Sequence, residues 1–305
     1  MTSEKNFIDL NTIDKNTLRK ILDLGKKLKA SNHSEFANSL SGKTLAMIFE
    51  KPSTRTRVSF EVGMRQLGGE VVTLLNENIQ SGRGETFADT ARVLSRYVDI
   101  LMIRTDSSSK LEELSSFSSI PVINGLTNLT HPCQIMADIM TFEEHKGDIK
   151  GKVLAWTGDG NNVANTLIQG AVQFDFTLRL ACPTELGPDK KILAWGEKLG
   201  ANIKLTDDPY EAVDNADCVI TDTWVSMHNK QGDRFNTLEP YRVTKKLMNF
   251  ASKDAIFMHC LPAHRGDEVE AEVIDGPNSV VWDEAENRLH VQKAILLWIL
   301  AINDF

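Results

Sequence analysis

Short apolar runs rich in β-branched residues alternate with segments of helical periodicity along almost the whole chain. Phe87, Ala91 and Leu94 recur at helical spacing, and so do Ile135 and Ile139. The predicted strands cover residues 44–49, 71–75, 100–103, 121–124, 153–156, 177–181, 202–205, 218–221, 255–259 and 280–282. This alternation predicts an α/β fold with parallel sheets and helices on both faces.

A polar, glycine-bearing stretch at residues 146–151 lies near the midpoint of the 305-residue chain and favours a domain boundary there. We therefore expect two doubly wound parallel-sheet domains, residues 1–149 and 150–288. In the last segment, Val291, Ile295, Trp298 and Ile302 fall on one stripe of a helix. We expect this helix, residues 289–305, to pack back on the first domain.

Composition and charge narrow the function classes. The chain has 42 acidic and 34 basic residues, a net charge of −8, which argues against long nucleic-acid contacts. Its longest apolar run, residues 294–302, is too short to span a bilayer, and the first residues do not resemble a signal peptide. Four widely spaced cysteines are typical of a reducing compartment. We therefore expect a cytoplasmic protein.

The segment after the first strand concentrates groups that bind anions. Ser53, Thr54, Arg55, Thr56 and Arg57 follow one another where a helix is expected to begin near Val58. Free N–H groups and the helix dipole favour an anion there, and arginine and hydroxyl side chains add donors. The alternative is an ordinary helix cap with solvated arginines. Three hydroxyls and two arginines exceed what a cap needs, so we favour a phosphate site.

Two other phosphate motifs are incomplete. Gly42-Lys43-Thr44 resembles the end of a P-loop but precedes its strand and lacks the first glycine. The glycine loop from Gly158 to Val163 has valine in place of the third glycine, and no acidic ribose ligand follows the next strand. An ATP or nicotinamide site is therefore disfavoured.

Further candidate groups stand at the ends of other predicted strands. They are Arg104, His131 with Gln134, Asp222, and His259 with Cys260. Each has a simpler interpretation: a solvated arginine, a half-buried histidine at a helix start, or a helix cap. Zinc is disfavoured because no second Cys/His pair lies at ligand spacing, and His259 and Cys260 point apart if their strand continues. Together the strand ends predict one active site in a crevice between the domains.

With these residues assembled, the chain resembles the ornithine carbamoyltransferases nearly end to end. The segments that carry the resemblance are Phe49-Glu50-Lys51-Pro52-Ser53-Thr54-Arg55-Thr56-Arg57, His131-Pro132-Cys133-Gln134, Asp222-Thr223-Trp224-Val225-Ser226-Met227 and His259-Cys260-Leu261-Pro262. The resemblance implies carbamoyl transfer from carbamoyl phosphate to the δ-amine of L-ornithine, giving L-citrulline and phosphate in arginine metabolism. It implies no metal and no organic cofactor.

The resemblance also implies roles for individual positions. The phosphate would be held by Ser53, Thr54, Arg55 and Thr56. Arg104 and His131 would polarise the carbamoyl oxygen, and Gln134 and the Leu261 carbonyl would bind the carbamoyl amino group. Arg288 would be a further contact to carbamoyl phosphate. Ornithine would be oriented by Asn162, Asp222, Ser226 and Met227, with Cys260 beside Asp222 near the reacting amine. Family members are trimers or multiples of trimers, so Gln80 would reach into a neighbour's site.

Alternatives remain at this stage. The amine could be putrescine or an acylated ornithine, or the chain could be a non-catalytic sensor of a phosphate ligand on the same scaffold. A redox enzyme that uses the Gly158 loop is a more distant alternative. His228 stands where the family usually has glycine after Ser-Met, and glycine permits backbone conformations that histidine resists.

Replacement of Arg104 tests the predicted chemistry. Negative charge develops on the carbamoyl oxygen in the tetrahedral intermediate, and a fixed donor stabilises it more than it stabilises the ground state. We expect Arg104→Ala to lower kcat by about 10²–10³, measured by citrulline formation. A loss smaller than about threefold would contradict this role.

Overall fold

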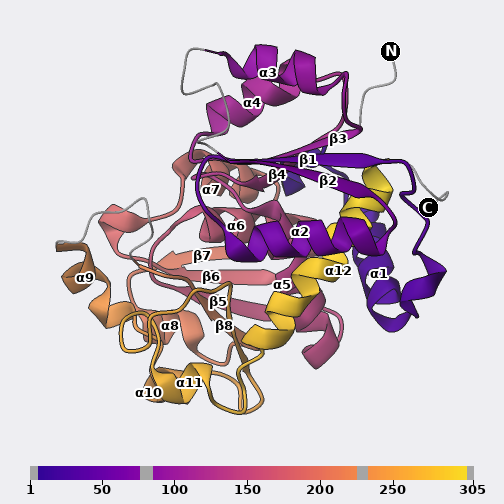
Figure 1. The fold of residues 1–305 in the computed structure, drawn as a ribbon. Coiled ribbons are helices and arrows are strands. Elements are labelled where there is room, and N and C mark those ends of the chain that lie inside the picture. Colours follow the sequence, from indigo (N-terminus) through magenta and orange to yellow (C-terminus); the bar gives the residue numbers. More distant parts are fainter. Residues whose placement is uncertain (1–5, 76–84, 225–232, 301–305) are drawn as a thin grey trace. The chain divides into compact units, whose positions relative to one another are not determined.

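The computed structural model describes residues 6–75, 85–224 and 233–300 (Figure 1). Its internal contacts divide the chain into two compact units. Unit 1 comprises residues 1–136 and 287–305, and unit 2 comprises residues 137–286. The predicted division at residues 149/150 stays a prediction.

Unit 1 is built on a four-stranded parallel sheet in the order β2-β1-β3-β4. Its strands are β1 (Thr44–Phe49), β2 (Glu70–Leu75), β3 (Ile100–Arg104) and β4 (Val122–Leu126). Its helices are α1 (Lys15–Ala30), α2 (Thr54–Gln66), α3 (Phe87–Leu94) and α4 (Ser108–Phe117), together with the start of α5 (Pro132–Lys146) and most of α12 (Val281–Ile299). Short 3₁₀ turns cover Leu10–Thr12 and His33–Glu35.

Helices cover both faces of this sheet. Successive strand side chains point to opposite faces, so Ala46 and Ile48 pack with the buried residues of α3 and α4 on one side. The opposite face is covered by α2 and α12 (Figure 1). These two helices approach closely, because a Cβ at Gly63 would lie 3.1 Å from the Cγ of Lys293.

Unit 2 has a five-stranded parallel sheet in the order β7-β6-β5-β8-β9. The strands are β5 (Val153–Thr157), β6 (Thr177–Ala181), β7 (Ile203–Thr206), β8 (Cys218–Thr221) and β9 (Ile256–His259). The helices are α6 (Asn162–Phe174), α7 (Lys190–Lys198), α8 (Pro209–Val213), α9 (Asp233–Leu238), α10 (Lys245–Met248) and α11 (Ala271–Ile274), with 3₁₀ turns at Thr184–Leu186 and Glu239–Tyr241.

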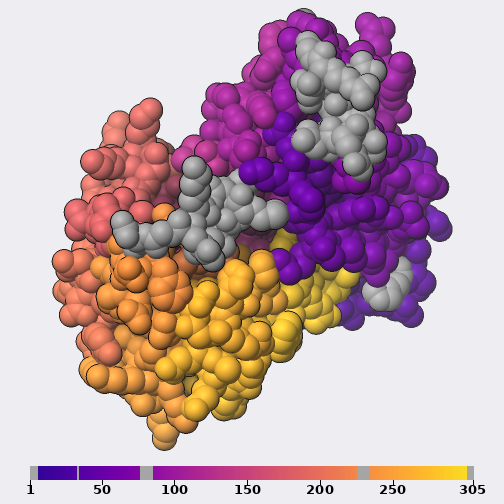
Figure 2. All heavy atoms as spheres, turned by 60° about the vertical axis from the view of Figure 1, so that its left-hand side comes forward, coloured from indigo at the N-terminus to yellow at the C-terminus, as the bar shows by residue number. Residues whose placement is uncertain are grey.

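The second sheet is also covered on both sides. Ala155, Val219 and Phe257 pack with buried residues of α8, α10 and α11. Helices α6 and α7 lie over the other face (Figure 1). The residues from α10 to the start of α12 appear together at the lower left of Figure 2 in orange and yellow. The predicted pair of doubly wound parallel-sheet domains is thus confirmed.

Each sheet has one point at which the strand order reverses. In unit 1 it lies between β1 and β3, and in unit 2 between β5 and β8. Connections leave neighbouring strands toward opposite faces at such a point, and ligands of open α/β sheets bind beside the carboxyl ends of the strands there. In each unit, the topology therefore selects the loops that follow those two strands.

The predicted strand at residues 280–282 is wrong. Val281 and Trp282 begin α12, and the residues just before them pair with the sheet through an isolated bridge between Ser279 and Phe257. The β-branched residues suggested a strand, but Asp283 and Glu284 follow in the first helical turn, where the helix dipole favours acidic side chains. Helix α2 likewise begins at Thr54, before the predicted start near Val58.

The return of the last helix to unit 1 is confirmed. The prediction of a single apolar stripe on this helix is wrong, because the helix is not amphipathic. From Asn287 onward α12 belongs to unit 1, and Trp298 stacks edge-on against Phe7 with ring centroids 6.3 Å apart. The buried side chains of α12 lie on all of its faces and include Lys293. The Nζ of Lys293 donates to Gln66 Oε1 at 3.1 Å. Ile302 lies outside the described residues.

A search of the described residues found no helix with the length and apolar character that crossing a membrane requires.

Candidate active-site residues in the two units

The first turn of α2 follows β1 at the switch point of unit 1. Ser53 occupies the N-cap position with extended backbone (φ −153°, ψ 105°). Within the described part of the chain its side chain makes no cap hydrogen bond. The ordinary-cap interpretation is therefore wrong for this serine. Thr54 and Arg55 are exposed, whereas Arg57 turns along the helix toward Glu61, 3.7 Å from Nε to Oε2.

Two arginines converge on the buried hydroxyl of Thr56. Arg104 Nη1 donates to Thr56 Oγ1 at 2.9 Å, and Arg288 Nη2 donates to the same oxygen at 2.7 Å. The two guanidinium groups therefore lie close together at the first turn of α2, where a phosphate or a developing oxyanion would meet charge-assisted donors.

Irregular strand pairing places Arg104 at this point. The register between β3 and β4 shifts at Ile103 and Arg104, so that Arg104 pairs with Leu126. Such irregularities re-aim the side chain that follows them. The arginine is thereby placed by the sheet itself rather than by a flexible loop.

His131 and Gln134 stand at the start of α5. The His131 backbone carbonyl accepts from the N–H of Gln134 at 3.1 Å, and both side chains are buried. Burial, and then the nearby charges of Arg288 and Arg104, hold the pKa of His131 well below its usual value of 6.5. The imidazole is therefore neutral near pH 7 and can donate one hydrogen bond without adding a third positive charge.

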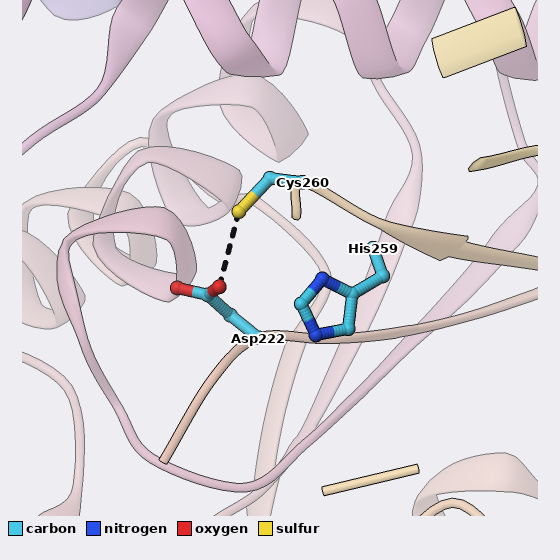
Figure 3. Close-up of side chains that lie close together, drawn as sticks. All are labelled: Asp222, His259 and Cys260. Atoms are coloured by element: carbon cyan, nitrogen blue, oxygen red, sulfur yellow. Dashed lines mark hydrogen bonds between the residues drawn. The ribbon is translucent and has the colours of Figure 1, made fainter. Parts of the chain in front are cut away.

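Asp222 follows β8 at the switch point of unit 2 (Figure 3). Its Oδ1 accepts from Cys260 Sγ at 3.1 Å, and its Oδ2 accepts from Asn161 Nδ2 at 2.7 Å. Desolvation and the Asp222 carboxylate raise the pKa of the Cys260 thiol well above its usual value. Cys260 is therefore a protonated donor and not a thiolate nucleophile.

His259 anchors the loop that carries Cys260. Its Nδ1 accepts from the N–H of Leu261 at 2.9 Å, and its Nε2 lies 3.2 Å from Glu268 Oε1. The backbone N–H of His259 donates to Glu284 Oε2 at 2.8 Å. Leu261 is held at φ +57°, a conformation that branched side chains rarely adopt and that marks functional constraint.

The expectation that His259 and Cys260 point apart is wrong. Strand β9 ends at His259, and ligand atoms of Asp222, His259 and Cys260 all lie within 4.8 Å of one another. Both ring nitrogens of His259 are already engaged, however, by Leu261 and Glu268. A metal at this cluster would have to break one of those bonds.

Some predicted residues cannot be placed, and one functional residue was missed. Gln80, Ser226 and Met227 lie outside the described residues, as does His228. Asn162 is the first residue of α6, but its neighbour Asn161 bonds Asp222. Asn161 also caps α6, its Oδ1 accepting from Val163 N at 2.9 Å. An asparagine directly before a helix was the available signal.

Two domain models of one protein family match consecutive parts of the chain. The carbamoyl-P binding domain model of the aspartate/ornithine carbamoyltransferases matches residues 5–144, and the Asp/Orn binding domain model matches residues 150–299. The chain belongs to the aspartate/ornithine carbamoyltransferase family.

Similar members of this carbamoyltransferase family are named ornithine carbamoyltransferase. The protein of Rhodopseudomonas palustris (strain BisA53) is 59% identical over 96% of both chains. That of Agrobacterium fabrum is 55% identical over 99% of this chain and all of the relative. The solved structure of ornithine carbamoyltransferase from Pyrococcus furiosus superimposes with a TM-score of 0.94 at 45% identity, covering 99% of this chain and 98% of that one.

The neutral state of His131 predicts a dependence of stability on pH. The unfolded histidine titrates near 6.5 and the folded one well below, so the unfolded chain binds more protons once the pH falls below about 6.5. We expect the free energy of unfolding to decrease as the pH is lowered below about 6.5. The contribution of His131 to this decrease is at most about 1.4 kcal/mol per pH unit. His131→Gln should reduce that slope in urea titrations between pH 5 and 7.

His145→Gln is the control for that experiment, because this partly exposed histidine pairs with Asp283 at 2.7 Å in unit 2. An unchanged slope in the His131 variant would show that this imidazole is already charged when buried.

Proposed function

We propose that the chain transfers the carbamoyl group of carbamoyl phosphate to the δ-amine of L-ornithine, giving L-citrulline and phosphate. The observation that carries the proposal is the convergence of Arg104 and Arg288 on Thr56 beside the exposed first turn of α2. The names and high identities of the relatives support the same activity. We place the reaction in arginine metabolism.

Carbamoyl phosphate binding is assigned to the first predicted domain, residues 1–149. We propose that the phosphate is held by Ser53, Thr54, Arg55 and Thr56, with Arg288 as a further contact. Backbone N–H groups and the helix dipole favour an anion at this helix start, and guanidinium groups add charge-assisted donors. Gln80 and Gln134 are proposed further contacts to the same substrate.

Ornithine binding is assigned to the second predicted domain, residues 150–288. Among residues 6–75, 85–224 and 233–300, the side chains bonded to Asp222 are neutral, namely the Asn161 amide and the Cys260 thiol. Asp222 therefore offers an ammonium group a carboxylate whose charge no cation has taken. The proposed ornithine contacts are Asn162, Asp222, Ser226 and Met227, with Cys260 at the reacting amine and the Leu261 carbonyl at the carbamoyl amino group.

The proposed chemistry uses fixed donors and the substrate's own leaving group. A neutral δ-amine attacks the carbamoyl carbon, and negative charge develops on the carbamoyl oxygen. Arg104 and neutral His131 donate to that oxygen and lower the barrier more than they strengthen substrate binding. The C–O bond to phosphate then breaks, and the departing phosphate takes the proton that the amine loses and leaves as the HPO4²⁻ dianion. No side chain has to act as a general base.

A citrulline assay with several amines tests the proposed function. We expect L-ornithine to be carbamoylated at least about tenfold faster than putrescine or N-acetylornithine, because Asp222 requires a free α-amino group. The measurement is product formation from purified protein and carbamoyl phosphate at equal amine concentrations. Faster reaction of putrescine would overturn the substrate assignment, and carbamoyl phosphate binding without any transfer would indicate a sensor.

We also propose that the chain forms a homotrimer or a multiple of trimers. Three valines of unit 1 support an interface because their side chains are exposed: Val58 and Val62 on α2, and Val72 on the edge strand β2. Exposed apolar side chains beside an unpaired strand edge are typical of an association surface. Four free cysteines support a reducing, cytoplasmic location.

Light scattering tests the assembly. We expect a mass of three times 34.0 kDa, or an integer multiple of that trimer, for the wild-type protein. Val58→Asp should lower the mass, because it places a charge in the buried part of the proposed interface. Val93→Asp, on the exposed face of α3, is the matched control. A monomeric wild-type mass at micromolar concentration would contradict the proposal.

A further inference from the structure

Three side-chain links join the loops that leave β5 and β8 at the switch point of unit 2. Thr221 Oγ1 donates to the Thr157 carbonyl at 2.6 Å, and Asn161 Nδ2 donates to Asp222 Oδ2 at 2.7 Å. The third link runs through Arg234 at the start of α9. The first two connect the loops directly, whereas the third brings in a positive charge.

Arg234 contacts both loops with different atoms of its guanidinium. Its Nε donates to the Trp224 carbonyl at 2.9 Å, and its Nη2 forms an ion pair with Asp159 Oδ2. The pair is largely buried, with 18% of the arginine side chain and 12% of the aspartate side chain exposed. Trp224 in turn stacks edge-on against Phe235, 5.6 Å between ring centroids. The guanidinium is therefore held at two points, and the residue after it packs against Trp224.

Two carboxylates share this region, and they differ in their partners. Asp159 faces the Arg234 cation, whereas the described partners of Asp222 are a neutral amide and a neutral thiol. Burial raises the pKa of Asp159, the charge of Arg234 opposes that rise, and the charge of Asp222 adds to it. The two acids are thus close enough to repel each other, and Arg234 cancels the charge of one of them.

We propose that Arg234 is a positioning residue that neutralises Asp159 and thereby leaves Asp222 as the single carboxylate to which the substrate ammonium binds. This inference rests on the proposed ornithine transfer. Without the arginine, Asp159 becomes a second anionic anchor two positions along the chain from Asn161, the hydrogen-bond partner of Asp222, and ornithine binds at two competing places. Only a minority of the bound ornithine molecules then has the δ-amine correctly placed, so KM for ornithine rises and kcat falls.

Charge-changing variants of the intact protein test the role of Arg234. We expect Arg234→Gln to lower kcat/KM for ornithine by at least about tenfold while the KM for carbamoyl phosphate stays within about twofold. Arg234→Lys keeps the positive charge and should lose less than the glutamine variant, although it cannot make both contacts of the planar fork. Asp159→Asn in the Arg234→Gln background removes the competing anion and should restore kcat/KM by at least about threefold.

Arg179→Gln is the matched control. Arg179 also belongs to unit 2 and donates from Nη1 to a backbone carbonyl, that of Asp214, at 2.6 Å, but it pairs with no carboxylate at the switch point. Its kinetics for ornithine should remain those of the wild type. Melting temperatures of all variants separate a folding defect from a binding defect. The double variant Asp159→Asn/Arg234→Gln lacks the buried unpaired charge that would destabilise Arg234→Gln alone.

The outcomes separate this inference from the proposed function. A wild-type protein that makes no citrulline from ornithine overturns the proposed function. A wild type that makes citrulline, with an Arg234→Gln variant as active on ornithine as Arg179→Gln, overturns the role of Arg234 alone. Equal losses in the glutamine and lysine variants without rescue by Asp159→Asn also overturn it, because the arginine then acts only as a structural link.

Discussion

Two guanidinium groups held on one uncharged hydroxyl are the constraint on which unit 1 depends. Arg104 comes from a strand and Arg288 from the last helix, yet both bond Thr56 in the first turn of α2. Like charges so close repel each other, and burial adds a desolvation cost. Folding maintains them through the sheet and through the packing of α12. In the proposed function a bound phosphate would remove this repulsion, and the donors that bind it would already be in place in the folded chain.

The same positive charge determines the state of His131. A third cation beside Arg104 and Arg288 would be costly, and burial acts in the same direction, so the imidazole stays neutral. In unit 2 the neighbouring charge is negative: desolvation and the Asp222 carboxylate keep Cys260 protonated as a thiol. Each unit therefore fixes the protonation of its candidate donor through the charge it already carries. A histidine of lowered pKa and a protonated thiol are weak bases near pH 7, which supports the proposed transfer of the amine's proton to the departing phosphate.

Much of this organisation could be predicted from the sequence, because strand periodicity and loop chemistry are local signals. Nine of the ten predicted strands overlap strands of the sheets, and candidates such as Arg104 and Asp222 do stand at strand ends. The failure at residues 280–282 came from weighing valine propensity above the acidic first turn of α12. The convergence of Arg288 on Thr56 spans 232 positions and has no local signal. For Asn161 the local signal indicated only a helix cap, because its bond to Asp222 is formed only when β5 and β8 pair.

Strand order explains why a few residues are enough to form a candidate binding site in each unit. Parallel strands bring the loops that follow them to one edge of the sheet, and a reversal of strand order leaves room for side chains between two of those loops. In unit 1, Thr56 lies in the first turn of the helix that follows β1, and Arg104 ends β3. In unit 2, the loops after β5 and β8 carry Asn161 and Asp222. Backbone pairing thus positions polar groups whose mutual repulsion or desolvation would otherwise separate them. An ammonium or phosphate group that binds there meets donors and acceptors that the fold has already oriented, and little of the binding free energy is spent on ordering side chains.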